Sequence, residues 1–98
     1  MSRGYVIGQL SIHHPEGYQA YSSQVAPTLL AFGGRFIVRG GEVTVLDGEP
    51  IGPRNVVIEF PSLQAAKDWY ESPPYQAIVK GRTQHADGYL LAVAGCEG

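Results

Sequence analysis

The chain has 98 residues, of which 44% are hydrophobic and 16% charged, and its formal net charge is −2. This length predicts one small domain over residues 1–98, with a core at about 4–94 and a flexible tail at 95–98. The hydrophobic share excludes a disordered chain. The slightly acidic balance, without any basic run, argues against nucleic-acid binding. A single cysteine, Cys96, excludes an internal disulfide framework.

The start of the chain lacks the apolar core of a signal peptide. No apolar run reaches the ~18–20 residues that span a bilayer. We therefore expect a cytoplasmic protein that has no membrane partner. Cys96 has neither a basic neighbour nor a second cysteine nearby, so we expect an unpaired thiol without a redox role.

The first third of the chain predicts a strand followed by a helix. Residues 5–12 alternate as a strand does, and Gly8 within it indicates the close approach of a bulky neighbour. Aromatic and aliphatic residues then recur at helical spacing over roughly 15–32. Because a proline inside a helix removes a hydrogen bond, Pro27 predicts a kink or break near residues 23–27.

Two strands and a long loop follow. Gly33-Gly34 ends the helix, since glycine accepts the left-handed cap conformation. Residues 35–39 are predicted as a strand that continues in extended form through 42–46. A loop rich in glycine and proline precedes a third strand at 54–60, whose apolar run indicates burial.

The last third predicts two short helices and a strand. Ser62 is a candidate N-cap for the first helix, and Ser72-Pro73 begins the second. Residues 88–94 form the final strand. The resulting β-α-β-β-α-β order predicts an α+β, ferredoxin-like sandwich: a four-stranded antiparallel sheet with helices on one face and strands one and three in the centre.

Two helices cover only one face of such a sheet, yet the strands at 5–12, 56–60 and 89–94 carry large apolar residues on both faces. A bare apolar face of that size favours association. We therefore expect a homodimer in which a second copy covers the sheet face by two-fold symmetry. The alternative is a monomer with an apolar groove.

Several segments together are similar to a bacterial family known as domain of unknown function 1330, in the dimeric α/β-barrel superfamily. These segments are residues 5–8, Pro15-Glu16, 32–41, 57–62, 69–73 and Tyr75-Gln76, within a similarity that spans about 4–94. One departure is His14, where the family pattern has an aspartate that would cap the helix. The resemblance implies a ferredoxin-like protomer and a dimer whose two sheets close a barrel.

The superfamily contains cofactor-free monooxygenases, muconolactone isomerases, haem-degrading enzymes and non-enzymatic ligand binders. The resemblance itself implies no reaction, and these activities are an analogy at the level of the fold. By that analogy we predict a homodimer that is a candidate cofactor-independent enzyme, of isomerase or monooxygenase type, acting on a small apolar or aromatic metabolite. The alternative is a non-catalytic ligand-binding or structural dimer. We expect no cofactor. We also expect no metal, because His13-His14 has no third ligand at usable spacing.

Three residues are candidates for catalysis. Glu59 lies in a central strand, where burial would raise its pKa toward values useful for proton transfer. Arg39, predicted to share a strand face with Arg35, would hold a carboxylate or enolate oxygen. His85 would act as a general base. The alternatives are an ion pair between Glu59 and an arginine such as Arg39, a place for Arg39 at the dimer rim, and an exposed loop position for His85.

A second group is predicted to bind the ligand. The aromatic residues Trp69, Tyr70 and Tyr75 would wall an apolar pocket between a helix and the sheet, and Arg82 would add a polar group. The alternative is that the aromatic residues are ordinary core with their hydroxyls reaching the surface.

Overall fold

Four strands form one antiparallel sheet in the order β2-β3-β1-β4 in the computed structural model, which describes residues 2–97. The strands are β1 (Gly4–Ile12), β2 (Arg35–Arg39), β3 (Arg54–Phe60) and β4 (Ala86–Ala94). β1 and β3 are central and β2 and β4 form the edges, as the sequence predicts. Burial alternates along β1 and β3, so each strand presents one buried face and one partly exposed face.

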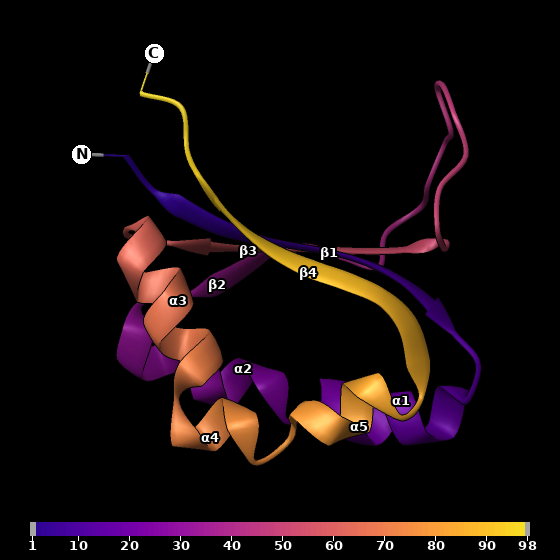
Figure 1. Cartoon of the computed structure of the whole chain (residues 1–98), viewed down its shortest axis with the longest axis horizontal. Helices are drawn as coiled ribbons and strands as arrows, with labels where there is room; N and C mark the ends of the chain where they lie inside the picture. The colour runs from indigo at the N-terminus through magenta and orange to yellow at the C-terminus, as the bar shows by residue number, and fades with distance from the viewer. Residues whose placement is uncertain (1, 98) are drawn as a thin grey trace.

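The helical segments all lie on one side of the sheet (Figure 1). They are α1 (Pro15–Ser22), α2 (Val25–Leu29), the 3₁₀ turn η1 (Leu30–Phe32), α3 (Leu63–Glu71), α4 (Pro73–Gln76) and α5 (Val79–Thr83). We call the side of the sheet beneath them the covered face and the other side the open face. This arrangement confirms the α+β, ferredoxin-like fold class.

Local signals explain where the helices begin and end. The predicted break lies between α1 and α2, so that Pro27 falls in the first turn of α2, where its missing N–H costs little. Gly33 caps η1 with a φ of 70°. Ser62 accepts a hydrogen bond from the Ala65 N–H and begins α3. His14 replaces the expected aspartate cap by accepting from the Gly17 N–H through Nδ1 at 3.2 Å.

The hydrophobic core lies between the covered face and the helices. Its largest fully buried side chains are Leu10, Phe60, Trp69 and Tyr75. Trp69 packs against Tyr75 with ring centroids 4.2 Å apart, and its indole N–H donates to Thr28 Oγ1 at 2.9 Å. This hydrogen bond satisfies the indole N–H, so the ring is buried without an unpaired donor.

The connection between β2 and β3 differs from the sequence prediction. Residues 42–46 form no strand. Instead, residues 40–53, which we call the arm, stand away from the sheet on the side opposite the helices (Figure 1). The amide of Ile51 donates to Gln9 Oε1 at 2.7 Å and ties the arm to β1. The last strand also begins two residues earlier than predicted, at Ala86.

The open face is rich in apolar groups. Exposed large side chains occur on both edge strands, with Val38 in β2 and Leu91 and Val93 in β4, and along the arm. Among residues 2–97, no helix combines the length and the apolar character needed to cross a membrane.

Candidate functional site

A small cavity lies between the covered face and the helices. Its volume is about 20 Å³, enough for one water molecule. Aromatic rings from α1 and α3 form part of its wall, and three guanidinium groups border it. The lining includes Tyr18, Tyr21, Trp69, Arg39, Arg54 and Arg82. We refer to Arg39, Arg54 and Arg82 as the cavity arginines.

Hydrogen bonds connect one cavity arginine to two tyrosines. Arg82, only 8% exposed, donates from Nε to the Tyr75 hydroxyl at 3.3 Å. The hydroxyls of Tyr75 and Tyr21 are 2.9 Å apart. Burial, together with the neighbouring Tyr75, raises the pKa of Tyr21 above its ordinary value. Tyr21 is therefore a neutral phenol at physiological pH, and either hydroxyl of the Tyr21–Tyr75 pair can be the donor.

The other two cavity arginines are held by aromatic rings. Arg39 lies 4.1 Å from the centroid of Phe36, and its Nη2 donates to the Ser22 carbonyl at 2.7 Å. Arg54 lies 5.2 Å from the centroid of Tyr18, and its buried Nε has no hydrogen-bond partner. Cation–π contact stabilises each guanidinium but leaves its charge uncompensated.

A larger groove opens beside the cavity, between α3 and the edge strand β4. Its volume is about 410 Å³, within the range of small-molecule sites. Tyr70 and Leu91 belong to its wall, and Lys67 and Glu71 are also part of it. The groove and the cavity share two lining residues, Leu90 and Arg82.

Leu90, which lines both the cavity and the groove, packs over Gly8. The two residues are opposite each other in the β1–β4 register. A Cβ atom on Gly8 would lie 2.6 Å from Leu90 Cδ2, which is closer than side chains approach. The bulky neighbour that Gly8 predicts is therefore Leu90.

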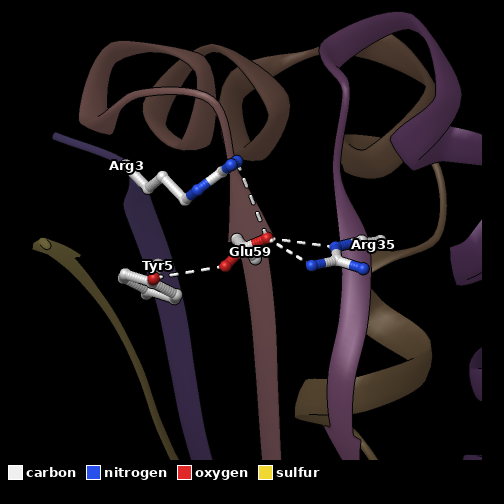
Figure 2. A network of polar contacts seen from close by, with 4 residues as sticks. All are labelled: Arg3, Tyr5, Arg35 and Glu59. Atoms are coloured by element: carbon white, nitrogen blue, oxygen red, sulfur yellow. Dashed lines mark hydrogen bonds and ion pairs between the residues drawn. The ribbon is translucent and has the colours of Figure 1, made fainter. Parts of the chain in front are cut away.

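Glu59 lies on the open face in a polar network with Arg3, Tyr5 and Arg35 (Figure 2), and it is not among the residues that line the cavity. Its side chain, 12% exposed, accepts hydrogen bonds from Arg35 at 2.9 and 3.0 Å and from the Tyr5 hydroxyl at 3.2 Å, and Arg3 lies 3.7 Å away. The Arg35 hydrogen bond, with help from Tyr5, lowers the pKa of Glu59. The expected upward shift from burial is therefore wrong.

A register shift in β2 explains why Arg39 does not pair with Glu59. The irregularity between Phe36 and Val38 aligns Arg35 with Glu59 but Arg39 with Val56, whose side chain is buried on the covered face. The two arginines therefore lie on opposite faces. The predictions of a shared face and of an Arg39–Glu59 ion pair are both wrong.

His85 lies between α5 and β4 and takes part in a local contact. Its ring stacks on His14 with centroids 5.0 Å apart, and its Nδ1 is 2.7 Å from the Gly81 carbonyl oxygen. It is not among the residues that line the cavity or the groove. The half-buried stacked ring also differs from the exposed loop histidine of the alternative reading.

The predicted ligand-binding residues are divided between the cavity and the groove. Trp69 borders the cavity, Tyr70 borders the groove, and Arg82 borders both. Tyr75 adjoins the cavity through its hydrogen bond to Arg82. Catalytic roles for Glu59, Arg39 and His85 stay predictions, and of these three only Arg39 lines the cavity.

Sequence reasoning missed Arg54, Tyr18 and Tyr21 as site residues. Arg54 precedes Val56 by two positions, so strand alternation places both on the covered face. Tyr18 and Tyr21 belong to the apolar stripe of α1, which also faces the sheet. Within residues 2–97, no cluster of three His, Cys, Asp or Glu side chains is arranged to hold a metal ion.

Residues 3–96 match the family described as "Domain of unknown function (DUF1330)", and the chain belongs to this family. No protein with a curated description matches the chain.

Solved structures share the fold at low sequence identity. The RPA0582 protein of unknown function from Rhodopseudomonas palustris is 21% identical, with a TM-score of 0.76 over 99% of this chain and 85% of that one. Its methylated form gives 22% identity and a TM-score of 0.72 over 98% and 82% of the two chains. SnoaB, a cofactor-independent oxygenase from Streptomyces nogalater, is 10% identical, with a TM-score of 0.68 over 100% and 97%.

Proposed function

We propose that this protein is a homodimer that binds a small apolar or aromatic metabolite in the groove and cavity of each protomer. One observation carries the binding function: a groove of about 410 Å³ meets, at Arg82 and Leu90, a cavity bordered by aromatic rings and buried polar groups. Apolar walls with a few convergent polar groups are typical of metabolite sites.

The chemistry that fits the site is cofactor-independent and of isomerase or monooxygenase type. The neutral Tyr21 hydroxyl and the Arg82 guanidinium are donors that would stabilise negative charge on a substrate oxygen. The fold shared with a cofactor-independent oxygenase supports the same class by analogy. The second candidate is a binding protein without turnover, which the distance of Glu59 and His85 from the cavity favours.

Oxygen uptake and product analysis with a panel of mono- and dihydroxynaphthalenes test these two candidates. Turnover that Tyr21→Phe abolishes, and that Tyr5→Phe on the open face preserves, supports the enzyme. Saturable binding without product in the wild type supports the non-catalytic binder. If neither a member of the panel nor an aromatic carboxylate such as phenylacetate binds, the proposed site is wrong.

The dimer is proposed through the open face. Exposed apolar side chains on the edge strands and the arm form a surface that is costly in water, and a second copy would cover it sheet to sheet. A second copy packed on the open face would also enclose the ion pair of Glu59 and Arg35 between the two protomers. The pairing satisfies both charges there.

Light scattering after size exclusion tests the assembly. We expect twice the chain mass of 10.6 kDa for the wild type. Leu91→Lys places a charge on the open face and is expected to give a single-chain mass. Leu30→Lys is the matched control, because Leu30 is exposed in the helical layer. A wild-type mass of 10.6 kDa at micromolar concentration contradicts the dimer.

A further inference from the structure

We propose that the ligand of this site is an organic carboxylate, whose charged end is bound by Arg82 and Arg54 while its apolar body lies in the groove. This inference rests on the proposed binding function and adds to it the charge of the ligand.

The first step concerns charge balance. Within residues 2–97, ion pairs closer than 4.0 Å join Arg3 and Arg35 to Glu59, and none involves a cavity arginine. The cavity is therefore lined by the buried Arg82 and the half-buried Arg54 without a carboxylate partner for either, whereas Arg39, which also lines it, is exposed. Buried charges are normally paired because their desolvation is costly. A bound anion would supply the missing partner.

The second step concerns the free donors. Arg54 Nε is buried and has no hydrogen-bond partner, which is rare in native proteins. Arg82 donates from Nε to Tyr75, and its side chain borders both the cavity and the groove. Guanidinium groups match carboxylate oxygens in a planar, often two-pronged geometry. Tyr21, which is neutral, also lines the cavity, and its hydroxyl would donate to a ligand when Tyr75 donates to it.

The third step concerns size. The inner cavity has room for about one water molecule, so it admits the small polar end of a ligand rather than a ring. The groove, about 410 Å³, is wide enough for an aromatic or short aliphatic body, and Val6, Ala66 and Leu90 give it an apolar wall. Since Arg82 lines both the cavity and the groove, its guanidinium would bind the charged end of a ligand whose apolar body lies in the groove.

Calorimetric titration with phenylacetate and with the neutral phenylacetamide tests the inference. Both probes share one apolar body and differ in charge. The lone tryptophan, Trp69, borders the cavity, so quenching of its fluorescence reports binding at this site. We expect phenylacetate to bind at least about tenfold more tightly than phenylacetamide, the margin of one charge-assisted hydrogen bond.

Three variants test which arginine binds the carboxylate of phenylacetate. Arg82→Gln is expected to weaken phenylacetate binding by about tenfold or more and to leave phenylacetamide nearly unchanged. Arg54→Gln is expected to act in the same direction and replaces the first variant if circular dichroism shows that Arg82→Gln does not fold. Arg35→Gln removes an equal charge from the open face and is expected to leave both affinities unchanged.

The outcomes separate this inference from the proposed function. Equal binding of both probes, or an Arg35→Gln effect as large as that of Arg82→Gln, overturns the carboxylate ligand while small-molecule binding stands. If neither probe binds or quenches Trp69 up to about 10 mM, the binding site itself is wrong.

Discussion

The arginines on the two faces of the sheet differ in whether a carboxylate pairs with them. On the open face, Arg35 is bound to Glu59 by two hydrogen bonds, and Tyr5 completes the coordination of the carboxylate (Figure 2). On the covered face, the cavity arginines have aromatic rings, a carbonyl and a hydroxyl as neighbours, but no carboxylate within 4.0 Å among residues 2–97.

This contrast is the reverse of what the cost of burying an unpaired charge would favour. Water screens a partly exposed charge, so an open-face arginine has the least need of a partner. Burial makes an unpaired charge most costly, yet the buried Arg82 and the half-buried Arg54 have no carboxylate partner, and only Arg39 among the cavity arginines is exposed. Arginines that reduce the stability of the folded chain without an internal partner are typical of a site arranged for something the chain does not itself contain.

The largest expected effect on the free energy of unfolding comes from removing a large core side chain that packs on the covered face. Trp69→Ala removes a side chain that is 0% exposed and should cost about 3–5 kcal/mol. That is a large share of the roughly 5–15 kcal/mol that stabilises a domain. Urea unfolding followed by circular dichroism measures the loss. Tyr70→Ala, the neighbouring and more exposed aromatic residue on α3, is the control and should lose much less. Equal losses would mean that the core is not centred on Trp69.

A second variant tests the close packing of Leu90 on Gly8, beside the cavity and the groove. Gly8→Ala forces Leu90 to move and should cost about 1–3 kcal/mol through overpacking. In a Leu90→Ala background the same change should cost little, because the clashing atom is gone. Unfolding free energies of the four proteins give the coupling directly. Strictly additive losses would contradict the close packing of Leu90 on Gly8.

The comparison of arginines predicts opposite signs on the two faces. Arg54→Met removes a buried unpaired donor and should stabilise the chain by about 1 kcal/mol, net of its lost contact with Tyr18. Arg35→Met strips the partner from Glu59 and should destabilise it. Urea unfolding at neutral pH measures both. Destabilisation by both variants would remove the distinction between the faces.

The smallest expected effect is the pH dependence of the Glu59 pair. Its pKa is lowered in the folded chain by the Arg35 hydrogen bond, so its contribution is fully present above the ordinary value of 4.5. The contribution disappears as the pH falls through the lowered pKa. Glu59→Gln should therefore melt below the wild type near pH 7, and the difference should shrink as the pH is lowered below 4.5. A difference that is independent of pH would contradict the lowered pKa.

The sequence predicts the fold well because the hydrophobic periodicity agrees with the proline and glycine residues that mark the ends of the elements. Alternation fixes β1 and β3, and Pro27 and Gly33 mark the helix break and end where the structure has them. The arm was missed because Val43 and Val45 alternate like a strand. Alternation does not reveal whether a neighbouring strand is available for pairing, and residues 42–46 form no strand.

The site was harder to predict because it depends on which face each side chain takes. Glu59 was correctly assigned to a central strand, but alternation along β3 turns it to the open face. Arg39 does not share a face with Arg35 as predicted, because the irregularity in β2 leaves no mark in the sequence. Arg54 was overlooked because a charged residue at the start of a strand is ordinarily solvated, whereas here its Nε is buried.

The position of β4 at the edge of the sheet has a practical consequence. This nine-residue strand carries only one charged side chain, Asp87, whereas β2 at the other edge has an arginine at each end. Long edges with little charge recruit further strands and begin aggregation. Concentrated solutions of this protein should therefore precipitate by β4-to-β4 pairing, and a single lysine introduced along that edge should slow the process.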